Sequence, residues 1–506
     1  MRKALVNLLT VLAFSMAAVG TMAAGPDSVS YTIKPIPRGD RVVLEATVRF
    51  NSAGPLDVGL PTDNFGTPDL HKYVTEFEGL DGTAVKQGDS AARRTVVPAG
   101  NGTVAIRYVL SYDPAVMEDY AYGPNVGADF FHLAGCQWLL HIGDDDEKRR
   151  MRVRFVDVPK GWKLYSSKDA TADDIDLEAS YDDWISAPIG GGANAHTFTL
   201  KGGRVAIFVH GRYDIPRERI YAAIEKIIRL EREWFDYHSQ PNFTVVVAPR
   251  PWVVAGYAPE DSFVCFIKPD VTPQQLNRLV AHELFHNWLP NKISIKQDKA
   301  FSGIRYEWFT EGFTDYFARK ILTRAGLMTT DEFAASVNAD LKSIADNPLK
   351  AATYADLARL EKERKYGPAA KKLAYFRGAV MALNWDQRIR ESGRGRNLSN
   401  FIRELHKLAA KTDGAVTEEA FFDFASKKYG IDARGELRRH ITDGEPIVPE
   451  ASALGSGYKL SWTELPAFDI GFSPDETNRT KRLTSVREDG PAYRAGLRDG
   501  MEFVAV

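Results

Sequence analysis

Alternating apolar and polar residues dominate the first part of the chain. Three segments show this alternation and are rich in β-branched residues: 42–50 (VVLEATVRF), 102–112 (GTVAIRYVLSY) and 151–158 (MRVRFVDV). Such a pattern is typical of strands with one buried face. The glycine-rich stretch GGGANA at 190–195 indicates a linker after them. The pattern therefore predicts an N-terminal β domain over residues 25–200.

Helical spacing replaces the alternation after about residue 215. Apolar residues recur every three or four positions over 220–235, which predicts a helix. Two short apolar runs, FTVVVA at 243–248 and SFVCFIK at 262–268, predict buried strands. Together these elements predict a mixed α/β unit over residues 201–325.

The helical pattern continues towards the C-terminus. Four helices are predicted, at 309–324, 368–391, 398–410 and 417–429. Gly430 suits the end of the last helix. We expect a helical part over 326–450 and a β-like tail over 455–506, so the chain as a whole is predicted to be a multidomain α+β protein.

The N-terminus has the composition of a signal peptide. Arg2 and Lys3 precede an apolar run from Ala4 to about Val19, and small residues follow up to Ala24. The run is shorter than the roughly 18–20 residues that a membrane-spanning helix needs. The sequence thus predicts a signal peptide over 1–24 and a periplasmic or secreted protein, with no stable membrane span after its removal.

Charge and cysteine content narrow the choice of function. The chain of 506 residues has 65 Lys and Arg against 67 Asp and Glu, without a basic block, which argues against a nucleic-acid partner. The two cysteines, Cys136 and Cys265, are too few for a thiolate zinc site. An oxidising compartment would permit a disulfide between them, and two buried free thiols are the alternative. The sequence leaves the oligomeric state open.

Two histidines four residues apart carry the clearest chemical signal. The segment AHELFHNWLP (281–290) contains His282, Glu283 and His286. Thr272, Pro273 and Gln275 form a helix start, so this segment is predicted to be helical. On a helix the two imidazoles share one face and can bind one cation, while Glu283 lies about 100° away, within reach of a water on that cation.

A catalytic zinc ion needs a third protein ligand and an open position. The best candidate is Glu311 in YEWFTEGFTDYF (306–317), on the next predicted helix. Asp315 lies one turn later and could hydrogen-bond the outer nitrogen of a ligand histidine, which would orient its ring. Two imidazoles and one carboxylate suit one Zn²⁺ per chain. Histidine pairs at this spacing also occur as ordinary core or surface residues, but this combination favours a metal site.

Zinc chemistry at this position would hydrolyse peptide bonds. Zinc would lower the pKa of a bound water to about 7, and Glu283 would take its proton and pass it to the leaving amine. The oxyanion that forms needs another donor. Tyr375 in LAYFRGAVMAL (373–383) is a candidate, although by spacing alone it is an ordinary aromatic residue of an amphipathic helix.

The three motifs HELFHNW, WFTEGFTDYF and AYFRGAVMALNWDQRIRE together resemble the glycyl aminopeptidase family of zinc metallopeptidases. That family belongs to the gluzincin clan. The resemblance implies an N-terminal β domain, a thermolysin-like catalytic domain over 201–325 with its helical C-terminal part over 326–450, and a PDZ domain. It also implies that His282, His286 and Glu311 bind zinc and that Glu283 is the general base. Tyr375 then resembles the tyrosine that hydrogen-bonds the tetrahedral intermediate.

The tail resembles the first two-thirds of a PDZ domain. FDIGFS (468–473) and SVREDGPAYRAGLRDGMEFVAV (485–506) carry this likeness, and Gly471 with Phe472 would belong to its carboxylate-binding loop. The groove of such a domain is normally lined by a helix that this stretch does not include. The tail is therefore expected to be a partial PDZ-like domain.

The chain departs from the family where the substrate amine is recognised. The family carries a glutamate on a strand before the zinc helix, and the corresponding position in AGYAPEDSFVCF (255–266) is Ala258. Glu260 is the candidate replacement, although a two-residue shift along a strand moves a side chain by roughly 6–7 Å. Gly256 would let a substrate backbone approach this strand. Asp315 departs too, since relatives carry a small hydroxyl residue there.

Three readings of the function therefore stay open. The first is an exported zinc aminopeptidase that acts on peptides or proteins. The second is an endopeptidase of the same fold without amine recognition, which Ala258 favours. The third is a non-catalytic peptide-binding protein, and the presence of both Glu283 and Tyr375 argues against it.

Overall fold

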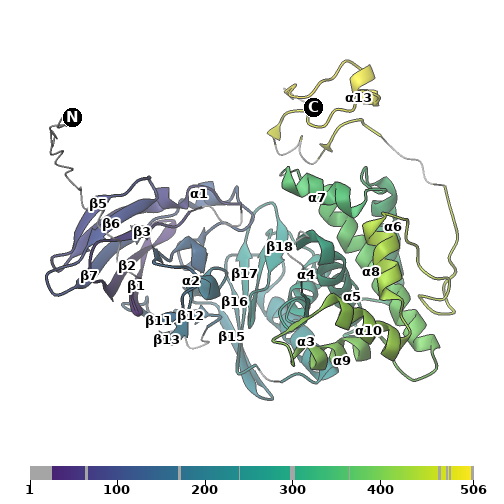
Figure 1. The fold of residues 1–506 in the computed structure, drawn as a ribbon, viewed down its shortest axis with the longest axis horizontal. Coiled ribbons are helices and arrows are strands. Elements are labelled where there is room, and N and C mark those ends of the chain that lie inside the picture. Colours follow the sequence, from purple (N-terminus) through teal and green to yellow (C-terminus); the bar gives the residue numbers. More distant parts are fainter. Residues whose placement is uncertain are drawn as a thin grey trace, which may run out of the picture.

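The computed structural model describes residues 25–502 except 63–65, 169–172, 239, 297–302, 364, 465–468, 475–476 and 478–479. The predicted signal peptide lies outside these residues. Figure 1 shows an N-terminal group of strands, a central sheet and a layer of helices following one another along the molecule. The described part is thus a mixed α+β protein with several layers, as the sequence predicts.

The N-terminal domain is built on a six-stranded sheet with the order β13-β11-β1-β2-β7-β4. Its strands are β1 (Ser28–Arg38), β2 (Arg41–Asn51), β4 (Val74–Leu80), β7 (Thr103–Leu110), β11 (Arg149–Phe155) and β13 (Asp174–Ala179). Buried and exposed residues alternate strictly along β11, because successive side chains point to opposite faces. The strands predicted from alternation, now β2, β7 and β11, are confirmed.

Two four-stranded sheets complete this domain, with the orders β10-β3-β6-β5 and β12-β14-β9-β8. Their strands are β3 (Leu56–Gly59), β5 (Ala84–Gln87), β6 (Arg93–Val97), β8 (Asn125–Val126), β9 (Phe130–Ala134), β10 (His141–Ile142), β12 (Lys163–Ser166) and β14 (Pro188–Gly192). The short helices α1 (Pro114–Met117) and α2 (Tyr181–Trp184) lie between them in sequence. The predicted linker at 190–195 is wrong, because Gly190–Gly192 form part of β14, a buried central strand. Glycines carry no side-chain pattern, so the sequence could not reveal this strand.

The central sheet has five strands in the order β15-β16-β17-β19-β18. They are β15 (Ala195–Leu200), β16 (Gly203–Val209), β17 (Asn242–Pro249), β18 (Val254–Tyr257) and β19 (Ser262–Ile267). β16, β17 and β19 are parallel, whereas β15 and β18 are antiparallel edge strands. β15 lies within the range predicted for the N-terminal domain, yet it belongs to this second sheet. The change of domain therefore falls near residue 193 rather than 200.

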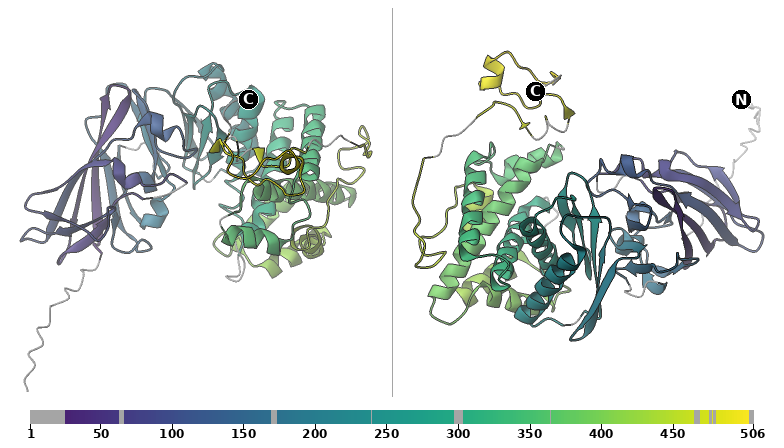
Figure 2. Two further views of the ribbon diagram at one scale, coloured as in Figure 1. Left: turned by 90° about the horizontal axis from the view of Figure 1, so that it is seen from above. Right: turned by 180° about the vertical axis from the view of Figure 1, so that it is seen from behind.

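Both faces of the central sheet are covered. Val245, Val247 and Cys265 pack in the same core as the helices, whereas Val246 and Val264 pack in a smaller core with Tyr165 of the N-terminal domain. The strands of such a sheet consist of continuous apolar residues in the sequence, because neither face of the sheet meets water. Figure 2 shows the N-terminal domain on one side of this sheet and the helices on the other.

The helices follow the predicted order. They are α3 (Arg217–Phe235), α4 (Pro273–Phe285), α5 (Thr314–Arg324), α6 (Thr330–Asp346), α7 (Tyr354–Lys362), α8 (Pro368–Glu391), α9 (Leu398–Ala409), α10 (Glu418–Tyr429) and α11 (Ala433–Glu436). There are also two π-helical turns. The first, η4 (Trp308–Phe313), leads directly into α5 and follows a 3-10 turn, Gly303–Tyr306. The second, η5 (Leu437–Thr442), follows directly after α11. The predicted start of α4 is confirmed: Thr272 and Gln275 exchange hydrogen bonds of 3.1 and 3.2 Å.

The tail has little regular structure among its described residues. It contains the short helix α13 (Pro491–Arg494) and one bridge between Arg482 and Glu502. This does not confirm a PDZ fold, so the PDZ-like domain stays a prediction. Cys136 and Cys265 are buried and unpaired. In the part of the chain that is described, no helix is both long and apolar enough to cross a membrane.

A buried polar cluster joins the two domains. The hydroxyl of Tyr165 lies 3.1 Å from His132 Nδ1 and 3.1 Å from His210 Nε2. Burial lowers the pKa of His210 to about 3 and lowers the pKa of His132 well below its ordinary value. Both imidazoles are therefore neutral in the folded protein at pH 7.

This cluster predicts a loss of stability in mild acid. An unfolded histidine takes up a proton near pH 6.5, whereas folded His210 does so only near pH 3. Between these values the unfolded state binds more protons, so stability falls as the pH falls. Between pH 7 and pH 5 the loss from His210 should be about 2 kcal/mol. Denaturant unfolding at both pH values measures it, and the His210→Gln variant should show a smaller pH dependence. An equal dependence in both proteins would contradict the prediction.

Candidate active site

Helix α4 presents two imidazoles to one point. His282 and His286 lie one turn apart, with their Nε2 atoms 3.1 Å from each other. The outer nitrogens are held by acceptors: His282 Nδ1 lies 3.1 Å from Asp315 Oδ1, and His286 Nδ1 lies 2.7 Å from Leu289 O. We assign the protons to both Nδ1 atoms on this basis. Both Nε2 atoms then direct lone pairs at the same place.

Glu311 reaches this place from the π-helical turn η4, which precedes α5. Its Oε2 lies 3.3 Å from His282 Nε2 and 3.4 Å from His286 Nε2. The turn is held against α8 by a glycine pair. A Cβ on Gly312 would lie 2.4 Å from Gly378 Cα, and a Cβ on Gly378 would lie 1.9 Å from Trp308 O. Only glycines allow this approach, which brings Glu311 beside α8.

These three groups fit a zinc ion. Within the described chain, His282, His286 and Glu311 are the group whose ligand atoms all lie within 4.8 Å of one another. Zinc ligands at 2.0–2.2 Å in tetrahedral geometry are about 3.3 Å apart, and the observed separations are 3.1, 3.3 and 3.4 Å. Three buried lone pairs without a proton between them repel one another, and a cation removes that repulsion. The residues present therefore suit Zn²⁺.

Asp315 lies behind the histidines. Its Oδ1 accepts from His282, and its Oδ2 lies 3.4 Å from Arg278 and 3.6 Å from Arg319. Burial disfavours the charged carboxylate, but the hydrogen bond from His282 and the charge of Arg319 outweigh burial and lower its pKa. Asp315 is therefore an anion placed to orient the His282 ring.

Glu283 lies between the metal-binding group and strand β18. Its side chain is buried, and burial raises its pKa. The strand approaches it closely, since a Cβ on Gly256 would lie 2.6 Å from the Glu283 carboxyl carbon. Gly256 thus makes room for the carboxylate. The cost of burying an unpartnered carboxylate keeps Glu283 ready to accept a proton.

Tyr375 faces the same centre from α8, one turn before Gly378. Its ring is stacked on that of His282, with centroids 6.1 Å apart and an interplanar angle of 5°. Burial and the negative charge of the nearby Glu311 carboxylate raise the pKa of Tyr375, so its hydroxyl keeps its proton. The structure thus brings Tyr375 together with the four residues of the two helical motifs.

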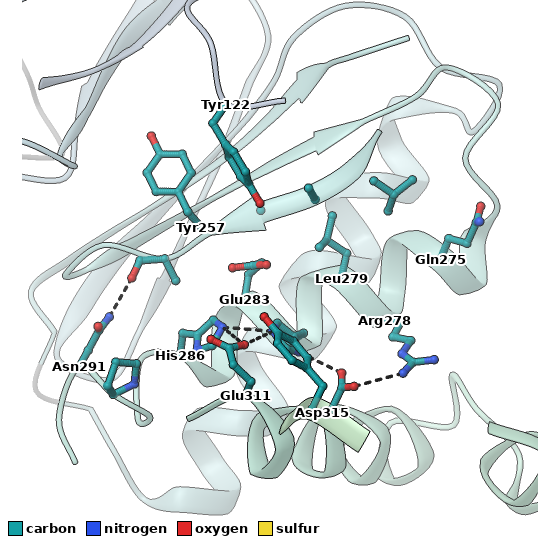
Figure 3. Close-up of a pocket in the computed structure, with 17 residues that line it drawn as sticks. Tyr122, Tyr257, Gln275, Arg278, Leu279, Glu283, His286, Asn291, Glu311 and Asp315 are labelled. Carbon is teal, nitrogen blue, oxygen red and sulfur yellow. Dashed lines mark hydrogen bonds and ion pairs between the residues drawn. The ribbon is translucent and has the colours of Figure 1, made fainter. Parts of the chain in front are cut away.

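These side chains line a cavity of about 600 Å³. Figure 3 shows Arg278 and Gln275 at one end, Asn291 at the other, and Glu283, His286 and Glu311 between them. Val254 to Ala258 form one wall. The first four of these residues are strand β18, the edge strand of the central sheet among the described residues, so this wall is formed largely by β18.

Glu260 does not line this cavity. It is exposed and lies beyond β18, where the chain turns towards β19, whereas Ala258 does line the cavity. The prediction that Glu260 replaces the missing glutamate is therefore wrong. The chain turns away after Ala258, whose carbonyl accepts a hydrogen bond of 3.0 Å from Asn291, so a side chain two residues later cannot take the same position.

Sequence reasoning missed several cavity residues. Tyr122 comes from the N-terminal domain, about 160 residues before Glu283, and no local motif marks it. Its ring meets that of Tyr257 edge-on, with centroids 6.3 Å apart. Arg278 carries a usable signal, since it lies four residues before His282 on the same face of α4.

A comparison with known protein families covers the segment that holds this site. Residues 275–380 match the family model of the M61 glycyl aminopeptidases. This segment holds both helical motifs and Tyr375, and the match confirms the predicted resemblance. The chain is a zinc metallopeptidase.

One solved structure supports the fold. The crystal structure of an aminopeptidase N family protein from Idiomarina loihiensis is 18% identical, with a TM-score of 0.72 over 94% of this chain and 89% of that one. The structure of an M1 zinc metallopeptidase from Deinococcus radiodurans is 15% identical, with a TM-score of 0.48 over 86% of this chain and 98% of that one. The first of these shows that the two chains share an overall fold.

The contact between Gly256 and Glu283 predicts that adding a methyl group at Gly256 lowers the activity. In Gly256→Ala the new Cβ would overlap the Glu283 carboxylate, and this side chain, being the flexible partner, must move. We expect the protein to fold and to bind zinc, with peptidase activity lowered at least about tenfold, because small displacements of a catalytic group are costly. Gly100→Ala is the matched control, since its Cβ would meet nothing within 4 Å. Full activity of Gly256→Ala would show that the contact is unimportant.

Proposed function

We propose that this protein is an exported zinc-dependent peptidase that hydrolyses peptide bonds, and that it acts as an aminopeptidase. The convergence of His282, His286 and Glu311 beside a buried Glu283 carries the proposal. Export rests on the composition of residues 1–24, whose basic start and apolar run suit a signal peptide.

His282, His286 and Glu311 are the proposed zinc ligands. Zinc held by such a group polarises a carbonyl oxygen and lowers the pKa of a water ligand to about 7. Asp315 holds the proton of His282 on Nδ1 and so keeps the Nε2 lone pair available to the metal.

Glu283 is the proposed general base. Its raised pKa lets it take a proton from the attacking water and deliver that proton to the leaving amine. Tyr375 is the proposed donor to the oxygen that becomes negative in the transition state. Its hydroxyl keeps its proton and lies beside Glu311, hence close to the reacting carbonyl.

The substrate backbone would bind along β18. This strand is the edge of the central sheet and its residues line the cavity. An extended peptide can add to such an edge as a further strand through main-chain hydrogen bonds. Gly256 lies on this strand and is packed directly against the Glu283 carboxylate, so a peptide paired with β18 would run beside the proposed base.

A second candidate is an endopeptidase of the same fold. Ala258 occupies the position at which the family glutamate is expected, and Glu260 lies outside the cavity. The carboxylates that line the cavity are Glu283, Glu311 and Asp315, and each already has a proposed role. A free substrate amine would thus have no carboxylate reserved for it among the described lining residues.

The base assignment predicts a separation of metal binding from turnover. Glu283→Gln keeps the size of the side chain and removes the base, so we expect about one zinc per chain with turnover lowered at least about a thousandfold. Elemental analysis and a peptide hydrolysis assay measure the two quantities. His286→Ala should instead lose zinc. Turnover of Glu283→Gln close to that of the unaltered protein would reject Glu283 as the base.

Blocking the substrate amine separates the two candidate functions. An aminopeptidase should cleave a peptide with a free N-terminus and leave its N-acetylated form intact. The rates for both forms of one peptide, measured with the same zinc-loaded protein, make this comparison. Equal rates would replace the aminopeptidase proposal with the endopeptidase one.

A further inference from the structure

Arg278 gives the cavity a positive end. Among the described residues that line the cavity it is the one Lys or Arg, whereas three carboxylates gather at the metal-binding centre. Figure 3 shows Arg278 at the end opposite Asn291. Charge is thus distributed unevenly along the cavity, and this distribution is a means of selecting the orientation of a charged substrate.

The Arg278 guanidinium is held at one of its nitrogens, and its other donors are available for hydrogen bonds. One Nη atom lies 3.4 Å from Asp315 Oδ2, which is the one hydrogen bond of this side chain within the described chain. A guanidinium has five N–H donors, and the side chain is 39% exposed. Asp315 therefore fixes where the guanidinium lies while most of its donors stay available to a ligand.

The position of Arg278 sets which part of a peptide it can reach. It lies four residues, about 6 Å along the helix axis, before His282. An extended peptide advances about 3.3 Å per residue. A group one or two residues away from the scissile bond would therefore meet the guanidinium.

A carboxylate is the partner that matches these donors best. Arg binds carboxylates through two parallel hydrogen bonds, which give both energy and direction. The opposite end of the cavity, at Ala258 and Asn291, offers no described carboxylate to a substrate amine. The group of this cavity that can bind a charged part of a peptide, besides the metal-binding centre, is therefore the Arg278 guanidinium.

We propose that Arg278 selects peptides carrying a carboxylate one or two residues from the scissile bond. This carboxylate is either the C-terminus of a short peptide or the side chain of an acidic residue. The inference rests on the proposed peptidase function and adds the substrate class. Arg278 is a specificity-determining residue in this scheme, and Asp315 positions it.

Three peptides distinguish the sources of the carboxylate: Ala-Ala-Ala-amide, Ala-Ala-Ala with a free C-terminus, and Ala-Asp-Ala-amide. Their kcat/KM values are measured with the zinc-loaded protein. Their affinities are measured by calorimetry on zinc-loaded Glu283→Gln, in which turnover is suppressed. We expect at least one carboxylate peptide to be preferred about tenfold or more over the neutral one, since hydrogen bonds to charged groups are strong. Preference for the free C-terminus or for the aspartate identifies the source.

Substitution of Arg278 tests whether this residue causes the preference. In Arg278→Gln the preference should vanish, because KM rises and affinity falls more for the carboxylate peptides than for the neutral peptide. Arg278→Lys should keep part of it, because an ammonium retains the charge but not the paired donors. Arg219→Gln, at an exposed position on α3, is the matched control and should leave all values unchanged.

Two results would overturn the inference. One is equal treatment of all three peptides by the unaltered protein. The other is an equal loss for all three in Arg278→Gln, which would mean that Arg278 only supports Asp315. Failure of the peptidase proposal looks different, since then no peptide is cleaved although the calorimetric preference for a carboxylate remains. Absence of both cleavage and preference would reject the two proposals together.

Discussion

Direct contact between two backbones holds this site together. Gly312 and Gly378 let the π-helical turn and α8 meet without side chains between them. Glu311 precedes the first glycine and Tyr375 lies one turn before the second, so one contact sets the positions of both. A methyl group at either glycine would push the two elements apart and separate the carboxylate from the histidine pair on α4.

The metal-binding group in turn depends on buried charge. Asp315 accepts a hydrogen bond from His282 and lies near Arg278 and Arg319, while Arg319 pairs with Asp340 at 2.6 Å. Two carboxylates and two guanidinium groups thus balance one another behind the site. Breaking a buried ion pair leaves an uncompensated charge and is strongly destabilising. The orientation of the His282 ring is therefore supported by several charged groups that are not themselves metal ligands.

Local features of the sequence predicted local features of the structure well. The capping residues of α4, the histidine spacing and the periodicity of α8 each depend on neighbours a few residues away. Glu311 could be placed because a motif marks it. By contrast, Tyr122 comes from another domain, β14 is a glycine strand without a side-chain pattern, and Glu260 turns away from the cavity. Tyr122 depends on how distant segments meet, whereas β14 and Glu260 depend on backbone conformation that the side chains do not mark.

The junction of the two domains has a consequence for access to the site. Asn125 donates a hydrogen bond of 2.6 Å to Pro249 O, and Arg250 donates one of 2.9 Å to Pro124 O. These bonds tie the loop that carries Tyr122 to the sheet that carries β18. One side of the cavity is therefore supplied by the N-terminal domain. A change in the angle between the two domains would widen or narrow the cavity at this side.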